Sequence, residues 1–431
     1  MILRRGHRCK HLWICGLITV VLLGVWFRLV WVMDLEYKGD EAWTFHQVQR
    51  ALEHQDIPWI GMPSSVGVPN PGMSVWVFLL LGTVFDVRDP PDLARAVQVV
   101  NCVGILFLLG FAFGVVAQKE REPWLWAVAL TSVNPFAVLF QRKIWPPSIF
   151  PVFSLLLLTG WWFRHHRWGA FIWGIVGACL GQIQMAGFFF TGSLAIVTAL
   201  CDYKRVAWFS WLTGTFLGLL PLIPWLHYTV ATGTPTSRVN WINLFTLRFW
   251  TVWISDPFGL GLKHYLGRHF WDFLAYPTVL DHPTYAVGMI HLAIIVTLAI
   301  IAIRFGQICW QDRGRWLTRW FAMMPNTMLV LSAAFVGYGV LFTLSLLPFQ
   351  RHYLMITFPL TYVWLATLVL RTQEDLALPA RRGRALLILL CLLQAALSGA
   401  FLSFIHENEG AIYGDYGRTY GAQQHSELIP Y

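Results

Sequence analysis

The chain has 431 residues, of which 57% are hydrophobic and only 12% are charged. A soluble domain carries about 25% charged residues, so this composition, with a mean hydropathy of +0.56, excludes a soluble protein. The formal charge of +9 could indicate nucleic-acid binding, but Lys and Arg in the loops of a multispan protein usually set its topology. We therefore expect an all-α, polytopic integral membrane protein.

The first predicted element is an apolar run, Leu12 to Met33, which follows the cations Arg4, Arg5, Arg8 and Lys10. The run is long enough to cross a bilayer, and it lacks the small-residue cleavage site of a signal peptide. Basic flanks stay in the cytoplasm. We expect a cytoplasmic N-terminus and an extracytoplasmic segment after the first helix.

Apolar runs along the whole chain predict about eleven membrane helices. They start near residues 11, 93, 123, 148, 168, 187, 206, 286, 320, 351 and 385. Most of the 31 Lys and Arg residues then fall in short internal segments, and the long loops 34–92 and 231–285 lie outside. We expect a transmembrane domain over residues 1–405 and a short extracytoplasmic tail over 406–431, in the plasma membrane (the inner membrane of a bacterium).

The first external loop contains two shorter helical patterns. Residues 72–86 are apolar, but about fifteen residues are few for a crossing, and a crossing here would place the basic clusters 119–121, 164–167 and 381–384 outside. We interpret 72–86 as an interfacial or re-entrant helix. Residues 42–53 have apolar side chains at helical spacing, which predicts an interfacial amphipathic helix.

Two adjacent carboxylates, Asp40 and Glu41, precede that amphipathic helix. Acids at a helix start are often caps, and Asp40 could be the N-cap. Alternatively, a carboxylate at the membrane surface could act as a general base that takes a proton from an attacking hydroxyl. The spacing alone leaves both interpretations open.

Four segments together resemble the GT-C glycosyltransferases that use polyprenyl-phosphate sugars, a group that includes protein O-mannosyltransferases, lipid A aminoarabinose transferases and related lipopolysaccharide-core sugar transferases. They are Lys38-Gly-Asp40-Glu41-Ala-Trp43, Pro69-Asn70-Pro71-Gly72, Asn134-Pro135 with Gln141-Arg142-Lys143, and Arg351-His352-Tyr353 with Pro359. These are similar, in order, to the family's Asp-Glu signature, its His-Pro-Pro-Leu element, its second-loop pattern and its Arg-Tyr-x-x-Pro helix. The resemblance implies a GT-C fold with Asp40 as the catalytic carboxylate.

The chain departs from that family at two places. Its second external loop reads Ile144-Trp145-Pro146-Pro147-Ser148, without the acid that relatives often carry, so a divalent metal has no support in the sequence. No Cys-x-x-Cys or His-x-x-x-His spacing indicates a metal site either. The aminoarabinose transferases also carry a sizeable external C-terminal domain, whereas about 25 residues follow the last predicted helix here. The sequence thus leaves metal dependence open without supporting it, and we expect no such domain.

The reaction implied by the resemblance needs a base, cations for the departing phosphate and contacts to the sugar. Asp40 would be the base, and Glu41 would position it or the acceptor. The candidate substrate-binding residues are Arg142, Lys143, Arg351, His352, Tyr353, Gln182, Gln184 and Asn70. Cations grip phosphate, but Arg142 and Lys143 could instead snorkel to the interface, and the two glutamines could join helices.

These observations predict a membrane glycosyltransferase. It would move a sugar from a polyprenyl-phosphate carrier to an extracytoplasmic hydroxyl on a glycolipid, polysaccharide or protein, with inversion. Its partners would be the lipid-linked donor, the acceptor and membrane lipids, without nucleic acid. A transporter or lipid flippase is an alternative, although transporters usually carry ionisable groups near the midplane and few occur in these helices. A polysaccharide polymerase or ligase is another.

Overall fold

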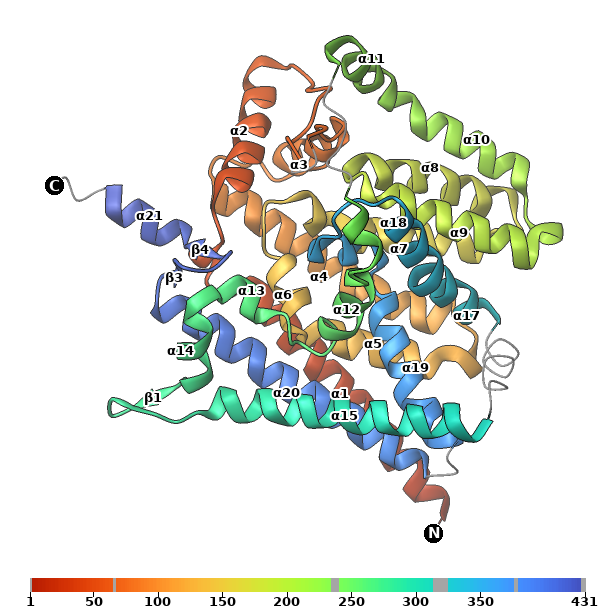
Figure 1. The fold of residues 1–431 in the computed structure, drawn as a ribbon, viewed down its shortest axis with the longest axis vertical. Helices are drawn as coiled ribbons and strands as arrows, with labels where there is room; N and C mark the ends of the chain where they lie inside the picture. The colour runs from red at the N-terminus through yellow and green to blue at the C-terminus, as the bar shows by residue number, and fades with distance from the viewer. Residues whose placement is uncertain (1, 65–66, 234–239, 313–324, 376–378, 428–431) are drawn as a thin grey trace.

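The computed structural model describes residues 2–64, 67–233, 240–312, 325–375 and 379–427, and this part of the chain is mostly helical (Figure 1). The helices of the first half are α1 (Ile2–Leu29), α2 (Gly39–His54), α3 (Met73–Val84), α4 (Pro90–Gly114), α5 (Arg121–Val133), α6 (Pro135–Phe140), α7 (Phe150–Trp162), α8 (Arg167–Ile183), α9 (Ala186–Asp202), α10 (Trp208–Leu219) and α11 (Ile223–Thr232).

The second half begins with short helices and then returns to long ones. They are α12 (Arg248–Ser255), α13 (Leu262–Leu266), α14 (Phe270–Ala275), α15 (Ala286–Asp312), α17 (Pro325–Ser332), α18 (Tyr338–Leu344), α19 (Leu360–Asp375), α20 (Ala380–Glu407) and α21 (Tyr420–Glu427). Two small antiparallel hairpins join β1 (Thr278–Val279) to β2 (His282–Pro283) and β3 (Gly410–Ala411) to β4 (Gly417–Arg418). The expectation of an all-α membrane protein is confirmed.

Within the described residues, six helices are long and apolar enough to cross a membrane, or seven if a bent pair counts as one span. The six are Pro90–Gly114, Ala186–Arg205, Trp208–Thr232, Ala286–Gln311, Asn326–Leu344 and Arg381–Glu407, and the bent pair is Arg351–Thr357 with Leu360–Arg371. The chain is thus an integral membrane protein, while the count of eleven spans stays a prediction. The helix start expected near residue 320 lies outside the described residues.

Prolines divide the expected helix near residue 123 into shorter pieces. α5 ends at Val133 because Pro135 lacks a backbone N–H and disfavours a helical conformation at Asn134. Asn134 instead caps α6, its side chain accepting a hydrogen bond from the backbone N–H of Ala137 at 3.1 Å. Residues 141–149 then form turns before α7, so this second external loop can reach the first one.

The first external loop has a small hydrophobic core of its own. Val48 of α2, Phe78 of α3 and Leu93 of α4 are completely buried in it, together with Ile144 from the second external loop. The expected apolar helix over 72–86 forms as α3, twelve residues long, and its position relative to the bilayer stays a prediction. This core holds the first and second external loops together.

Candidate functional site

Two buried arginines fix the end of α1, from which the first external loop departs. Arg142 donates hydrogen bonds to the backbone oxygens of Phe27 and Trp31. Arg28 donates to the oxygens of Thr131 and Ser132, both at 2.8 Å, and to the side chain of Gln141. Arg142 is only 4% exposed. Its guanidinium therefore acts on the protein's own backbone, and it positions the loop that carries Asp40.

A buried charge cluster lies beyond the end of α1. Glu36 pairs with Lys143 from the second external loop and with Lys38, whose Nζ lies 2.6 Å from Glu36 Oε1. Glu36 and Lys143 are almost completely buried. Lys143 also lies 5.1 to 5.5 Å from the ring centres of Phe140, Trp145 and Tyr265, a geometry that stabilises a cation.

Glu41 is the acid that caps α2. Its side chain is buried and accepts a hydrogen bond at 3.1 Å from the backbone N–H of Lys38, the N-cap residue. Burial raises the pKa of Glu41 to about 7, and the nearby Glu36 carboxylate adds to this shift. The expectation that Asp40 could be the N-cap is wrong, because α2 begins at Gly39 and its N-cap is Lys38, two residues before Asp40.

Asp40 lies in the first turn of α2 and its side chain is exposed. The indole of Trp145 donates a hydrogen bond to its carboxylate. Partial desolvation by the surrounding protein raises the pKa of Asp40 above its ordinary value, while Lys38, that hydrogen bond and Lys143 oppose the shift. An accessible carboxylate with a raised pKa, held by one hydrogen bond, is suited to accept a proton.

Aromatic residues continue the site from Trp145 toward the C-terminal half of the chain. The ring of His352 lies 4.4 Å from that of Trp145, and Tyr353 packs against His352 at the same distance. Gln184, at the end of α8, forms a hydrogen bond with the side chain of Tyr353. Trp145, which contacts Asp40, is therefore connected through His352 and Tyr353 to Gln184.

Further cations come from Arg351 and from the loop 231–285. Arg351 donates a hydrogen bond to the buried carboxylate of Asp256 at 2.5 Å. Burial lowers the pKa of His264, and so do the positive charges of Arg351, Arg248 and Lys143, whereas Asp415 raises it. His264 thus stays neutral near pH 7, and its surroundings are rich in positive charge. A phosphate group would be stabilised there.

The C-terminal tail packs between the two long loops (Figure 1). Tyr416 is buried, and its hydroxyl donates a hydrogen bond to the backbone oxygen of Asp34. Its backbone N–H donates a hydrogen bond to the backbone oxygen of Tyr265 at 2.9 Å. Lys38 reaches Asp415 of the tail, with its Nζ 3.5 Å from the carboxylate. Residues 406–427 therefore form one wall of the Asp40 site.

Two of the expected substrate-binding residues, Gln182 and Asn70, are buried and form hydrogen bonds with the protein backbone. Gln182 is completely buried and donates to the backbone oxygen of Gly218 in α10 at 2.7 Å, which is the interhelical bond considered as its alternative. Asn70 is also buried and donates to the backbone oxygen of Met62 at 3.2 Å. Both shape the scaffold around the site in this structure.

The described residues contain no group of three or more His, Cys, Asp and Glu side chains arranged to hold a metal ion. Two buried acids near the site, Glu36 and Asp256, are each paired with cations of the protein. Glu36 is engaged by two lysines, and Asp256 by Arg351. The donors present are those of an ion-pair network.

Three solved structures are similar to this chain at low sequence identity. The oligosaccharyltransferase of Archaeoglobus fulgidus in its apo form is 14% identical, with a TM-score of 0.46 over 89% of this chain and 56% of that one. ArnT from Cupriavidus metallidurans, bound to undecaprenyl phosphate, is 13% identical, with a TM-score of 0.45 over 96% of this chain and 77% of that one. AglB from Archaeoglobus fulgidus, in complex with an inhibitory peptide and a dolichol-phosphate, is 13% identical, with a TM-score of 0.44 over 90% and 56%.

This chain therefore spans little more than half the length of the archaeal oligosaccharyltransferase. No protein-family model matches its sequence, and no curated protein matches it. With all three TM-scores below one half, the chemistry of the site has to be derived from its own residues.

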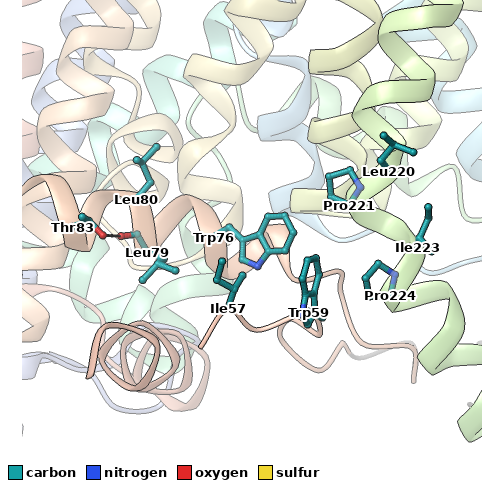
Figure 2. A pocket seen from close by; sticks show the side chains of 10 residues that line it. All are labelled: Ile57, Trp59, Trp76, Leu79, Leu80, Thr83, Leu220, Pro221, Ile223 and Pro224. Carbon is teal, nitrogen blue, oxygen red and sulfur yellow. Dashed lines mark hydrogen bonds between the residues drawn. The ribbon is translucent and has the colours of Figure 1, made fainter. Parts of the chain in front are cut away.

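An apolar groove lies beside the first external loop. It has a volume of about 730 Å³ and runs between α3, the segment around Trp59, and the bend between α10 and α11 (Figure 2). Trp59 and Trp76 pack edge to face on one side, and Pro221 and Pro224 face them across the opening. The one hydroxyl in the lining, that of Thr83, is bonded to the backbone oxygen of Leu79. The lining is therefore mainly apolar.

Sequence reasoning missed several charged residues at the site. Glu36 lies among other charged residues of its loop, and no local pattern distinguishes Arg248, Asp415 or His264. One sequence feature could have indicated that Asp256 is important: it is the single charged residue in the stretch Phe249 to Leu262. A buried carboxylate needs a cation as partner.

Proposed function

We propose that this protein is a membrane glycosyltransferase that moves a sugar from a polyprenyl-phosphate carrier to an extracytoplasmic hydroxyl group, with inversion at the anomeric carbon. One observation carries the proposal: the accessible carboxylate of Asp40 lies near the cations Lys38 and Lys143, and Lys143 in turn adjoins His264 together with the cations Arg248 and Arg351. These four cations come from distant parts of the chain. The resemblance of the segments around Asp40 and Arg351 to the GT-C pattern supports the same conclusion.

In the proposed reaction, Asp40 takes the proton of the acceptor hydroxyl as that oxygen bonds to the anomeric carbon. The bond between this carbon and the phosphate oxygen breaks, and the phosphate leaves with the electron pair. Arg351 and Arg248 stabilise the added negative charge. The departing phosphate needs no proton, so one carboxylate suffices, in contrast to the acid and base pair of glycoside hydrolysis.

The ion pair with Asp256 holds the Arg351 guanidinium in place and leaves part of it available. Asp256 engages only Nη1 of its guanidinium among the described residues, and the group is 24% exposed. The remaining N–H donors can therefore bind a phosphate oxygen. Arg248 is exposed and pairs with no acid in the described part of the chain, so it tests the phosphate site without disturbing a buried pair.

The decisive experiment measures the release of free carrier phosphate from radiolabelled undecaprenyl-phosphate sugars by the purified protein, with extracted envelope lipids as acceptor. Asp40→Asn should lower turnover at least a hundredfold, because general-base catalysis contributes about that much. Asp56→Asn, which removes an exposed acid from the same loop, should leave turnover unchanged. Equal turnover in wild type and Asp40→Asn would falsify the proposal.

Arg248→Gln extends the same assay to the phosphate. We expect a higher KM for the donor, roughly tenfold, with a smaller change in kcat, since a charge-assisted contact contributes about 1.5–3 kcal/mol. A normal KM would exclude Arg248 from donor binding.

A further inference from the structure

A second cavity lies at the far end of α7 and α9 from the Asp40 cluster. α7 begins near Trp145 and ends just before Arg164, where a cavity of about 660 Å³ opens. Its walls come from the α7–α8 turn, the end of α9 and the start of α17. The ionisable and amide side chains among its ten lining residues include Arg164, His165, Asp202, Lys204, Arg205 and Asn326.

The single acid in this lining is already neutralised. Asp202 accepts hydrogen bonds from Arg164 Nε at 2.8 Å and pairs with His165 Nε2 at 2.9 Å. Arg164 also donates to the side-chain oxygen of Asn326 at 3.0 Å and stacks over the ring of Trp161. The Arg164 side chain is 3% exposed, so it is a fixed part of the cavity wall.

Two further cations in the lining have no such compensation. Lys204 and Arg205 are exposed, and neither forms an ion pair within the residues that the structure describes. With three permanent cations and one acid, the cavity lining is positively charged at neutral pH. An anion would relieve this excess.

The surroundings place this charge where lipid headgroups would lie. The candidate spans Ala186–Arg205 and Trp208–Thr232 meet at the turn that holds both cations, and Trp208 fixes the turn through a hydrogen bond from its indole to the backbone oxygen of Tyr203 at 2.8 Å. Trp and cations at the ends of spans mark the membrane interface. The adjoining Leu200 is 79% exposed, which provides an apolar surface for an acyl chain.

We propose that this cavity binds the phosphate headgroup of an anionic phospholipid. Lys204 and Arg205 contact the phosphate, Arg164 supplies a fixed positive wall, and one acyl chain lies along Leu200. A zwitterionic headgroup carries its own cation into this field and binds more weakly. The site is independent of the Asp40 chemistry.

The test uses native mass spectrometry of the full-length protein in detergent, titrated with phosphatidylglycerol or with phosphatidylcholine of the same acyl chains. Wild type should retain phosphatidylglycerol more tightly. Lys204→Gln with Arg205→Gln should weaken its binding roughly thirtyfold and weaken the binding of phosphatidylcholine much less. The matched control is Arg381→Gln with Arg382→Gln, which removes two exposed cations at the start of α20.

Three outcomes would overturn the proposal. One is equal retention of the two lipids by wild type, and another is the same loss in the control pair, which would indicate general surface charge. The third outcome comes from thermal unfolding with inorganic phosphate alone. The ligand is a soluble phosphate if inorganic phosphate raises the unfolding midpoint of wild type but not that of the Lys204→Gln, Arg205→Gln variant, and if phosphatidylglycerol raises the midpoint no more than phosphatidylcholine does.

Discussion

Asp40 and Glu41 are neighbours in the sequence, yet their carboxyl groups have different environments. Glu41 is buried against Glu36 and caps a helix, whereas Asp40 is exposed beside Trp145. The helical turn separates the two side chains by about 100°, so one faces the loop's own charge cluster and the other faces outward. Of the two carboxylates, that of Asp40 is accessible from outside the protein, whereas that of Glu41 is engaged in the helix cap.

The hydrogen bond from Trp145 predicts a specific pH dependence. The carboxylate of Asp40 must be ionised to act as a base, so activity falls as the pH drops through its raised pKa. Trp145→Phe removes a bond that favours the ionised form, so the pKa rises further. We expect the acidic limb of the pH profile of kcat/KM to move to higher pH, with activity recovered in alkali. Trp43→Phe is the control, and an unmoved limb would show that Trp145 does not act on the base.

Glu41 gives a prediction about stability. Its pKa is about 7 in the folded protein and about 4.5 when unfolded, so ionisation of Glu41 lowers the free energy of unfolding. This destabilisation is fully present above pH 7 and disappears as the pH falls toward 4.5. Glu41→Gln keeps a hydrogen-bond acceptor without the charge. It should raise stability by roughly 1–3 kcal/mol at pH 8, and by less at pH 5.

Thermal unfolding midpoints at the two pH values check this, with Glu53→Gln, an exposed change in the same helix, as the control. A variant less stable than wild type at pH 8 would mean that the ionised form of Glu41 is a net stabilising partner of the nearby lysines.

At the scale of elements, close helix contacts and the tail decide the shape of the site. Gly174 of α8 and Gly214 of α10 let these helices approach until a Cβ on either would lie 2.2 Å from a backbone oxygen of the other helix. Small residues allow such contacts between membrane helices. This close packing places the α10–α11 bend opposite α3, where the apolar groove lies (Figure 2).

The tail should detach when its buried tyrosine is removed. Tyr416→Ala deletes a buried ring and its hydrogen bond to Asp34, a loss of about 3 kcal/mol or more. We expect faster tryptic cleavage after Arg418, which is exposed, and lower transferase activity because the tail forms a wall of the site. Tyr413→Ala, at a residue that is 67% exposed, should leave cleavage unchanged. If both variants are cut alike, Tyr416 does not anchor the tail.

At the scale of the whole molecule, the Asp40 cluster and the phospholipid cavity should lie on opposite sides of the membrane. The span Ala186–Arg205 has 20 residues, about 30 Å of helix, which matches the hydrocarbon thickness of a bilayer. In a cysteine-free protein, Arg418→Cys should react with a membrane-impermeant maleimide from outside, and Lys204→Cys only after permeabilisation. Labelling of both from one side would contradict the topology.

The sequence by itself was sufficient to predict an all-helical membrane protein, the positions of most helices and the carboxylate pair after the first one. These properties depend on apolar runs, prolines and charges within about twenty residues of each other. The helix over 72–86 was predictable for the same reason.

Only the tertiary structure decided which charges meet. Arg142 turns inward to the end of α1, while its neighbour Lys143 reaches Glu36, and Arg351 pairs with Asp256. The tail contributes Asp415 from beyond the last long helix. Such partners are set by the path of the chain over hundreds of residues and by the cost of leaving a buried charge unpaired, which no local pattern contains.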